Sequence, residues 1–371
     1  METRLKRRRR AAVAVVCGLA VGAFAFGVAL GDGEPPAASA SSKLTPKQLA
    51  GQRLVVGFPG TDPPAAVRAM VREGRIAGVI LFAENFPSRE AGRHAVARLQ
   101  AIRRPPGLRD PLLVMIDQEG GLVKRIDGAP TASAEAIGAR GAAFAAEQGE
   151  RTAANLRDVG VNVDLAPVLD VARPGSDTEA TERGFGSTAA AVSATAIPFA
   201  EALQEGGVAA TAKHFPGLGS ARLNTDFAVQ RVPLSKATLR GVDEAPFRRF
   251  VAVGGEMVMI GSAIYPALSP KPAAFSRTIA TGELRERLGF EGVSITDALG
   301  SVAVADFGGP AKAGVAAARA GTDVLLFTDF QSGARAGDAL LRALRSGRLR
   351  RADFEASAGR VLRLRHVLAE R

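Results

Sequence analysis

The chain has 371 residues, 47% of them hydrophobic, which is enough for one large domain or two small ones with a substantial core. Aromatic residues amount to 5% and Trp is absent, a composition that favours helices packed closely on a sheet over an aromatic-rich binding module. The formal net charge of +11 is not grouped with aromatic side chains, so no nucleic-acid partner is expected, and Cys17, the single cysteine, excludes an intramolecular disulfide and a Cys-rich metal site.

The first 42 residues differ from the rest of the chain. Residues 1–10 are strongly basic, residues 11–30 carry no formal charge, and a linker rich in Pro, Ala and Ser follows over residues 32–42. This pattern predicts an export signal or a single membrane anchor rather than part of a folded domain. The stretch Ala38-Ser39-Ala40 resembles a cleavage site for such a signal. We therefore expect an exported protein, extracellular or in the cell envelope, with a membrane tether through residues 11–30 as the alternative to cleavage.

Short apolar runs alternate with helical segments from residue 43 onward. Eight of the runs are predicted to be buried strands: 53–57, 76–82, 111–117, 161–170, 207–214, 257–262, 292–297 and 323–327. Helices are predicted to begin at Thr45-Pro46 and to cover residues 88–102, 133–159, 188–204, 236–253, 279–288, 311–320, 334–344 and 354–368.

The eight predicted strands are continuous apolar runs, which is typical of parallel strands buried on both faces. Their alternation with helices predicts a (β/α)8 barrel of the TIM type, an α/β fold, as a single domain over residues 43–371. A doubly wound open sheet is the alternative. It would not explain why polar residues gather at the carboxyl ends of so many strands, whereas a barrel brings those ends together at one mouth.

Charged and polar side chains follow the predicted strands at the points where they end. They are Asp117, Arg125, Arg183, Lys213, His214, Ser262, Tyr265 and Asp297. Each alone has a structural explanation, such as a helix cap for an aspartate or a loop-holding ion pair for an arginine. Around one concavity they suit a polyhydroxylated ligand, because carboxylates and cationic donors both bind hydroxyl groups and a carboxylate can attack a carbon atom.

Five motifs stand at these strand ends: Asp117-Gln118-Glu119-Gly120-Gly121, Ala166-Pro167-Val168-Leu169-Asp170, Arg183-Gly184-Phe185-Gly186, Lys213-His214-Phe215-Pro216-Gly217 and Ile295-Thr296-Asp297. With them the chain resembles the family 3 glycoside hydrolases. The resemblance is closest to the bacterial β-N-acetylhexosaminidase branch, which acts on N-acetylglucosamine residues of peptidoglycan fragments. It covers the chain from residue 44 onward and corresponds to the N-terminal barrel domain of that family.

The resemblance implies roles for the residues of these motifs. Asp297 is implied as the nucleophile of a retaining glycosidase, which also needs a second group to protonate the leaving oxygen and later activate water. Lys213 and the arginines are expected to keep Asp297 ionised by lowering its pKa. No metal ion or other cofactor is implied. The residues implied to line the sugar subsite are Asp117, Arg125, Arg183, Lys213 and His214.

The chain departs from the family pattern at the acid/base residue. The hexosaminidase branch carries Asp-Ser-His in the loop after Lys-His-Phe-Pro-Gly, with the histidine as acid/base, and this chain has Asn224-Thr225-Asp226 there. Three outcomes stay open: Asp226 serves as a carboxylic acid/base whose pKa the closed site raises, another acid from the loops does so, or the barrel binds sugar with little hydrolysis. The chain also has Leu122, Leu218 and Ser262 where the family often has arginine, histidine and histidine, respectively.

These observations predict a retaining β-glycosidase with Asp297 and Asp226 as catalytic residues. The expected carbohydrate substrate is a β-linked N-acetylglucosaminide, for which peptidoglycan fragments are the candidate source. A catalytically weak saccharide-binding barrel and a β-glucosidase-like specificity are the alternatives, because nothing in the sequence identifies a pocket for an N-acetyl group. The sequence makes no prediction of oligomeric state.

Overall fold

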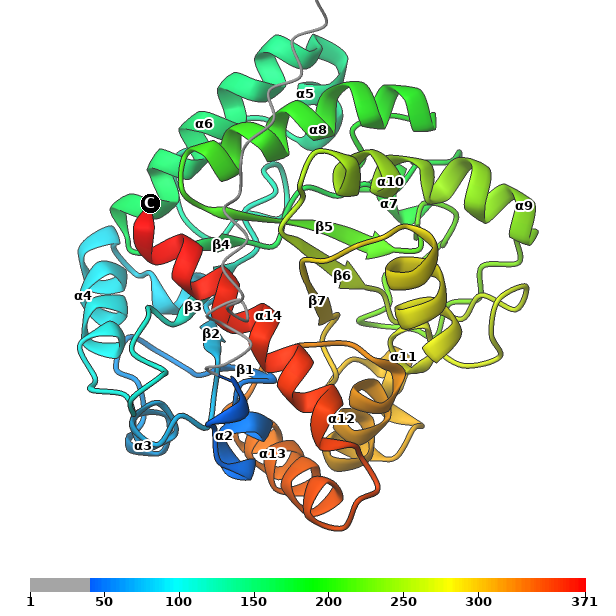
Figure 1. The fold of residues 1–371 in the computed structure, drawn as a ribbon. Helices are drawn as coiled ribbons and strands as arrows, with labels where there is room; N and C mark the ends of the chain where they lie inside the picture. Colours follow the sequence, from blue (N-terminus) through cyan, green and yellow to red (C-terminus); the bar gives the residue numbers. More distant parts are fainter. Residues whose placement is uncertain (1–40) are drawn as a thin grey trace, which may run out of the picture. The chain divides into compact units, whose positions relative to one another are not determined.

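The computed structural model describes residues 41–371, in which parallel strands form a barrel with helices around it (Figure 1). The eight strands of this described part are β1 (Leu54–Gly57), β2 (Gly78–Ile80), β3 (Leu113–Ile116), β4 (Val163–Asp164), β5 (Ala209–Phe215), β6 (Met257–Ile260), β7 (Val293–Thr296) and β8 (Leu325–Phe327). Each strand pairs with its neighbours in chain order, and β1 also pairs with β8. A parallel bridge between Ile295 and Val324 joins β7 to β8 and closes the barrel.

The predicted (β/α)8 fold is confirmed, and the strands lie inside the predicted runs except for Phe215 at the end of β5. β4 is much shorter than the predicted run 161–170. Its regular ladder stops before Pro167, which has no N–H to donate to a neighbouring strand. Pairing resumes at Val168, which bridges to Lys213.

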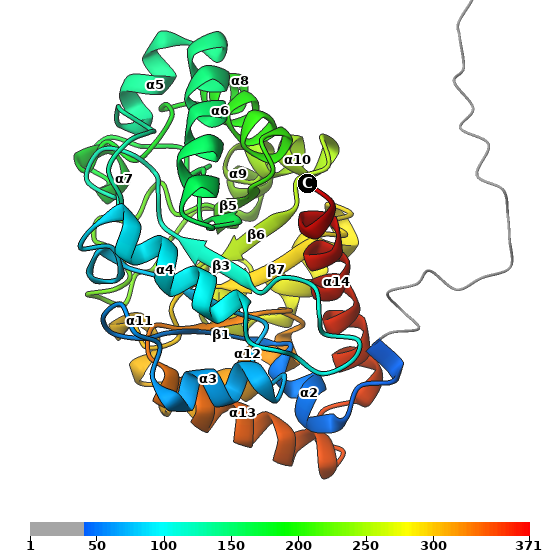
Figure 2. The same cartoon turned by 90° about the vertical axis from the view of Figure 1, so that its left-hand side faces the viewer.

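Helices surround the barrel, and Figure 2 shows α3, α4 and α6 beside the strands. The α-helices are α2 (Pro46–Gly51), α3 (Ala65–Arg72), α4 (Arg89–Gln100), α5 (Ala134–Arg140), α6 (Ala142–Asp158), α7 (Asp177–Ala180), α8 (Ala189–Glu205), α9 (Lys236–Thr238), α10 (Ala245–Ala252), α11 (Val302–Ala305), α12 (Gly309–Ala320), α13 (Phe330–Arg345) and α14 (Arg351–Glu370). Shorter 3-10 turns and wider π-type turns are η1 (Ala83–Asn85), η2 (Leu239–Asp243), η3 (Ala273–Phe275) and η4 (Thr278–Arg287).

Three of the predicted helices differ from the structure, and α3 is an additional helix. The predicted helix 133–159 is two helices, α5 and α6, because Gly141 between them has φ +85°, a left-handed conformation that glycine adopts at little cost. The predicted helices 236–253 and 279–288 contain the π-type turns η2 and η4. α3 lies in a stretch for which no element was predicted.

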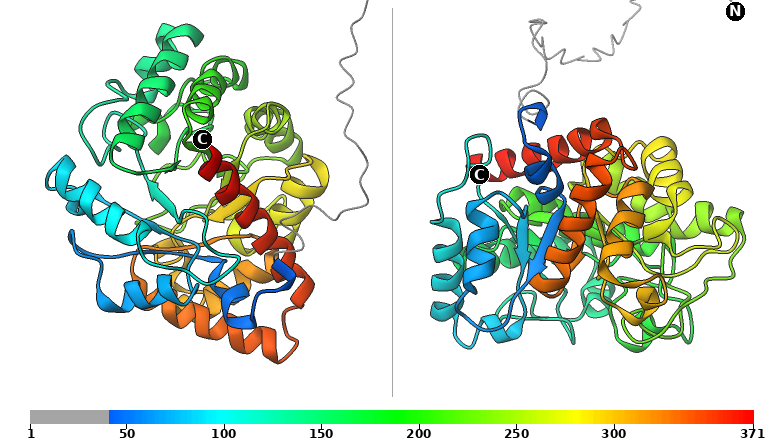
Figure 3. Two further views of the ribbon diagram at one scale, coloured as in Figure 1. Left: turned by 60° about the vertical axis from the view of Figure 1, so that its left-hand side comes forward. Right: turned by 90° about the horizontal axis from the view of Figure 1, so that it is seen from below.

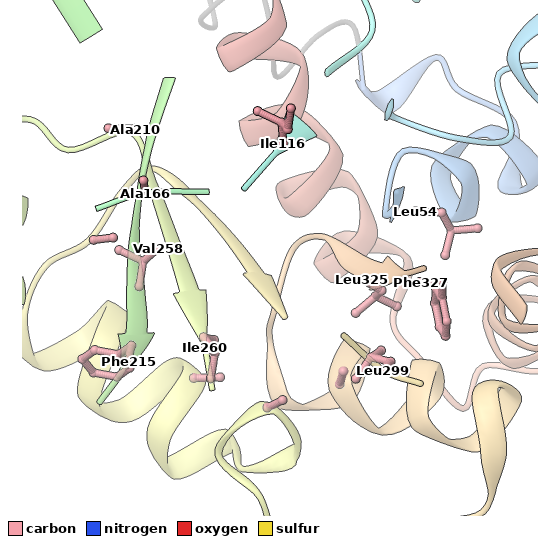
Figure 4. Close-up of a cluster of buried hydrophobic side chains, with 14 of the residues drawn as sticks. Leu54, Ile116, Ala166, Ala210, Phe215, Val258, Ile260, Leu299, Leu325 and Phe327 are labelled. Carbon is pink, nitrogen blue, oxygen red and sulfur yellow. The ribbon is translucent and has the colours of Figure 1, made fainter. Parts of the chain in front are cut away.

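Two clusters of buried apolar side chains hold the barrel together. The larger cluster lies between the strands and the outer helices, and Figure 4 shows some of its strand residues, among them Leu54, Phe215 and Phe327. The smaller cluster fills the interior of the barrel with side chains such as Met115 and Ile295. Burial of this apolar surface is the main term that stabilises the fold.

α14 closes the amino-terminal end of the barrel, where it contacts residues that precede the strands. Arg365 donates a 2.8 Å hydrogen bond to the carbonyl of Pro111 before β3, and Arg360 pairs at 2.7 Å with Asp323 before β8. Val361 of the same helix joins the interior cluster. α14 crosses the barrel end that faces the viewer in Figure 1, and it is seen from another side in Figure 3. The loops that follow the strands therefore lie at the opposite end.

The N-terminal predictions concern residues that the structure leaves undescribed. Residues 11–30, the predicted signal or anchor, lie outside residues 41–371, so export and the domain boundary at residue 42 stay predictions. Among the described helices, none is both long enough and apolar enough to cross a membrane.

Candidate active site

A pocket of about 330 Å³ lies at the carboxyl ends of the strands, a size at the lower end of small-molecule sites. Apolar side chains of the barrel interior, such as Leu165 and Met259, contribute to its wall together with the polar residues of the loops. All seven residues predicted for the site line this pocket: Asp117, Arg125, Arg183, Lys213, His214, Asp226 and Asp297.

Lys213, at the end of β5, is the centre of a buried ion-pair network. Its ammonium group lies 2.7 Å from Oδ1 of Asp117 and 2.6 Å from Oε1 of Glu119, and its side chain is only 2% exposed. Arg183 binds both oxygens of Glu119 at 2.8 Å. Arg125 reaches Asp117 more loosely, at 3.7 Å. Side chains from the loops after β3 and β4 are thereby joined in one network with Lys213.

The charges of this network keep Glu119 and Lys213 ionised despite their burial. Burial alone would raise the pKa of Glu119, but Arg183 and Lys213 together hold it well below its usual range. Burial alone would lower the pKa of Lys213, but Asp117 and Glu119 raise it above its ordinary value. The pocket therefore presents charged donors and acceptors side by side at neutral pH.

His214 is held by Asp170, which follows β4. Nδ1 of the ring lies 2.7 Å from Oδ2 of Asp170, so Nδ1–H donates to the carboxylate and Nε2 is left for another partner. The other oxygen of Asp170 accepts hydrogen bonds from the backbone N–H groups of His214 and Leu218, at 3.2 and 2.6 Å. One carboxylate thus fixes both the imidazole and the loop that follows β5.

Asp297 stands directly after β7, with its backbone N–H bonded to the carbonyl of Ile260 at 3.0 Å. Its Oδ1 accepts a 2.7 Å hydrogen bond from the N–H of Ala298, and its Oδ2 accepts a 3.3 Å bond from the hydroxyl of Thr225. Lys213, Arg125 and Arg183 form their ion pairs with Asp117 and Glu119. The expected effect of these cations on Asp297 stays a prediction.

Asp226 lies on the loop after β5, and that loop is bonded to the segment after β7. The carbonyl of Asp226 accepts a 3.2 Å hydrogen bond from the N–H of Val302, and the carbonyl of Thr225 accepts one of the same length from Ala303. Asp226 is exposed at the pocket mouth, but the loss of surrounding water to the neighbouring atoms of the pocket, and then the charge of Asp297, raise the pKa of Asp226 above its usual range. Asp226 consequently keeps its proton to a higher pH than an ordinary aspartate.

This chain matches a known protein family over most of its length. Residues 47–364 match the glycosyl hydrolase family 3 N-terminal domain. This chain belongs to glycoside hydrolase family 3. An uncharacterized secreted glycosyl hydrolase of Arthroderma benhamiae is 36% identical over 86% of this chain and 93% of its own length. A β-hexosaminidase of Alkalilimnicola ehrlichii is 35% identical over 74% of this chain and 79% of its own length.

Solved structures of family 3 glycoside hydrolases share this barrel. A β-N-acetylglucosaminidase from Paenibacillus sp. FPU-7 matches with a TM-score of 0.83 and 35% identity over 88% of this chain, which spans 63% of that structure's length. A β-N-acetylhexosaminidase from Beutenbergia cavernae matches with a TM-score of 0.81 and 28% identity over 87% of this chain and 99% of its own. The predicted glycoside hydrolase class is thereby confirmed.

Several residues that organise this family 3 site were not among the predicted site residues. Glu119 and Asp170 lie within the quoted motifs, and their buried carboxylates hold Arg183, Lys213 and His214. The signal that would have found them is their place in those motifs beside cations that need a buried partner. Thr225, whose hydroxyl donates to Asp297, was likewise not a predicted site residue.

A metal ion is not part of the expected family 3 chemistry. Within residues 41–371, no three side chains of His, Cys, Asp or Glu are grouped so that they could hold a metal ion. The roles of the site residues and the expectation of cofactor-free catalysis stay predictions.

Proposed function

We propose that this protein is a retaining β-glycosidase with Asp297 as nucleophile and Asp226 as acid/base. The observation that carries the proposal is that both carboxyl groups line one pocket, on loops joined by the hydrogen bond from Thr225 to Asp297. The raised pKa of Asp226 supports the acid role, because a general acid must hold its proton near the working pH. A carboxylic acid thus takes the place of the histidine that the hexosaminidase branch uses.

The proposed reaction has two steps. Asp297 attacks the anomeric carbon while protonated Asp226 gives its proton to the departing oxygen, so that the glycosidic bond breaks and a glycosyl ester forms on Asp297. Asp226, now a carboxylate, then takes a proton from a water molecule whose oxygen attacks the same carbon and releases Asp297. The hydrogen bonds from Ala298 and Thr225 stabilise the Asp297 carboxylate before attack and after release.

The proposed sugar subsite is the charged side of the pocket. Carboxylate and cationic groups already oriented by their mutual ion pairs bind hydroxyl groups without a large ordering cost. Nε of Arg125 is buried and has no hydrogen-bond partner among the described residues, which supports its availability to a ligand. The residues assigned to this subsite are Asp117, Arg125, Arg183, Lys213 and His214.

The proposed substrate is a β-linked N-acetylglucosaminide. The support is that the relatives with this barrel include a β-hexosaminidase and a β-N-acetylglucosaminidase. Peptidoglycan fragments are the proposed natural source, because the basic and apolar N-terminal residues 1–30 predict export to the envelope. The secreted relative from Arthroderma benhamiae supports export.

Replacement of Asp226 tests the proposal. We expect Asp226→Ala to lower turnover of a substrate with a poor leaving group at least about a hundredfold more than that of an activated aryl glycoside, because only the former needs its leaving oxygen protonated. Azide should partly restore the second step in the variant. In the parent, kcat/KM should fall as pH rises through the raised pKa of Asp226, and Asp226→Ala should lose this alkaline limb.

Asp306→Ala is the matched control, since Asp306 is an exposed aspartate just beyond α11 that does not line the pocket. If Asp226→Ala treats both substrate classes as the parent does, Asp226 is only a loop residue. If the parent binds N-acetylglucosamine but does not cleave even the aryl glycoside, the saccharide-binding alternative replaces the hydrolase. Faster cleavage of aryl β-glucoside than of the N-acetylated analogue would favour the β-glucosidase-like specificity.

A further inference from the structure

Exposed basic side chains gather at the end of the barrel opposite the pocket, in the segments before β1, β2 and β3 and around the turn between α13 and α14. Residues 41–53, 72–77, 101–111 and 342–351 carry ten exposed cations and a single exposed acid, Glu73. We define the basic face as these ten cations: Lys43, Lys47, Arg72, Arg103, Arg109, Arg342, Arg345, Arg348, Arg350 and Arg351.

The pocket end of the barrel has the opposite balance of charge. In the loops that follow the strands, the exposed charged residues are seven acids and four cations: Asp62, Glu84, Asp127, Glu179, Glu182, Asp226 and Asp306, with Arg222, Arg231, Lys271 and Arg277. The segments before β4, β5 and β7 carry exposed acids and lie outside the basic face. The positive charge therefore lies on one side of one end of the barrel.

Hydrogen bonds and ion pairs join the segments of the basic face into one surface. Arg351 at the start of α14 donates to the carbonyl of Leu44 at 3.1 Å, and Lys47 of α2 pairs with Glu73 at 2.8 Å. Farther along α14, Arg365 is bonded to the segment before β3. Figures 1 and 2 show α2 beside α13 and the first part of α14.

Most cations of the basic face have no acidic partner. Lys47, Arg350 and Arg351 form ion pairs, whereas the other seven have no carboxylate oxygen within 4.0 Å in the described part of the chain. A guanidinium group without a partner can bind a phosphate group through two parallel hydrogen bonds. The basic face therefore suits a partner that presents many anionic groups on a broad surface.

The place where the described chain begins favours a membrane as this partner. The carbonyl of Ser42 accepts a 3.3 Å hydrogen bond from Arg351, so residues 1–40 are attached at the basic face. The apolar run predicted as signal or anchor, residues 11–30, is connected to residue 41 through residues 31–40, which can span at most about 35 Å. An anchor in residues 11–30 would keep the basic face within reach of lipid headgroups.

We propose that the basic face binds the surface of an anionic lipid membrane and directs the pocket away from the lipid. Each basic residue close to anionic headgroups strengthens such binding by about fivefold. The acids of the pocket end are repelled by the same headgroups, so the charge difference between the two ends sets the orientation. A cell-wall substrate then reaches the pocket from the side that faces away from the membrane.

Energy transfer from a dye on the protein to a dye on the lipid headgroups measures this orientation in the full-length chain. Cys17→Ser removes the single cysteine, and the donor dye is attached through Ser346→Cys beside the basic face or, in a second protein, through Asp306→Cys at the pocket end. The two ends are separated by roughly 25 Å, the length of the 17-residue α6.

Vesicles of phosphatidylcholine with phosphatidylglycerol provide the anionic surface. With them we expect transfer from position 346 to exceed transfer from position 306 by about twofold or more. The ratio should fall towards one with phosphatidylcholine alone, and also in about 1 M salt, where charges are screened beyond about 3 Å.

Two triple substitutions with equal changes in net charge locate the source of the orientation. The first removes three charges of the basic face through Arg342→Gln, Arg345→Gln and Arg348→Gln, and it should bring the transfer ratio towards one. The control removes three exposed cations from the segments after β5 and β6 through Arg231→Gln, Lys236→Gln and Lys271→Gln, and it should keep the parent ratio. All six side chains are exposed, so the unfolding midpoints of both variants should match the parent.

The outcomes separate a membrane from other partners. Equal transfer from the two positions with anionic vesicles would overturn the membrane assignment, and so would a ratio that persists in the arginine variant. If soluble poly(glycerol phosphate) retains the parent but not the arginine variant, while both have the same orientation on vesicles, the basic face binds an anionic polymer instead. None of these measurements requires cleavage of a sugar, so their failure leaves the proposed β-glycosidase function intact.

Discussion

Lys213 shows how a buried cation can be placed between two carboxylates so that it and Glu119 remain charged. Breaking such a network by removing one member costs about 3–5 kcal/mol of folding free energy, because a buried charge is left without a partner. Here the ammonium of Lys213 lies within 2.7 Å of both Asp117 and Glu119, and Glu119 is also bound by Arg183. The same contacts that stabilise the loops also orient the donors and acceptors of the proposed sugar subsite.

Glu119 should make stability depend on pH. Its pKa is lowered in the folded protein, so the unfolded chain takes up a proton first as pH falls below the ordinary value of about 4.3, and the stability from this group is lost from there downward. Glu119→Gln should be less stable at pH 7 and should lose less additional stability between about pH 5 and pH 3. Urea unfolding across this range measures both effects.

The control for this experiment is Glu150→Gln, which alters an exposed glutamate on α6. It should keep the stability of the parent and its pH dependence. If Glu119→Gln shows the same acid-induced loss as the parent, the network around Lys213 does not hold Glu119 in its charged form.

Asp297 is the residue on which the proposed covalent step depends. Asp297→Asn should lower turnover of an aryl β-N-acetylglucosaminide on the order of a thousandfold or more, because the amide keeps the shape and loses the nucleophilic charge. The amide oxygen can still accept from the N–H of Ala298, so the unfolding midpoint should change little. Asp306→Asn provides the control. Parent-like turnover in Asp297→Asn would remove this carboxylate from the mechanism.

At the scale of elements, the loop after β5 is held by hydrogen bonds from the segments that follow β4 and β6. Arg173 binds both carboxylate oxygens of Asp243 at 2.6 and 2.8 Å, and the N–H of Arg173 donates to the carbonyl of Gly219 at 2.9 Å. The hydroxyl of Tyr265 donates to the carbonyl of Gly217 at 3.0 Å. These bonds fix the backbone that leads from His214 towards the acid/base loop.

Gly217 should be the most sensitive point of this loop. It has φ +124°, and a Cβ there would lie 2.6 Å from Cβ of Asp243. Gly217→Ala should therefore destabilise the protein by about 1–3 kcal/mol and lower activity through a displaced His214. The matched control is Gly241→Ala, where a Cβ would meet nothing within 4 Å. Equal thermal unfolding midpoints for the two variants would show that the loop tolerates the added methyl group.

The elements predicted best are those for which residue propensity, hydrophobic pattern and burial all favour the same structure. Each predicted strand was found, because a short continuous apolar run is typical of a parallel strand that is buried on both faces. The break at Gly141 depends on one residue in a left-handed conformation, and the shortened β4 depends on Pro167. A hydrophobic pattern averaged over a dozen residues does not detect the effect of a single residue. The π-type turns η2 and η4 leave no periodic signal.

At the scale of the whole molecule, the barrel divides into a structural end and a functional end. α14 covers the start of the strands, and the seven predicted site residues meet at their finish. That meeting followed from strand order and family resemblance. The ion pairs within the pocket could not be predicted from the sequence, because the contact of Lys213 with Asp117 depends on side-chain distances in the folded protein.

The last prediction concerns where this barrel works. The basic residues 1–10 and the uncharged residues 11–30 should direct the full-length protein to the envelope or medium. Arginine in place of Leu19 and Val21 should retain it in the cytosol, because charges within the apolar run oppose insertion. Removal of residues 1–40 should leave a folded barrel with an unchanged unfolding midpoint. The cut falls after residue 40 because Arg351 donates to the carbonyl of Ser42 at 3.3 Å. Fractionation followed by an aryl glycosidase assay tests the expectation, and full-length protein confined to the cytosol would contradict it.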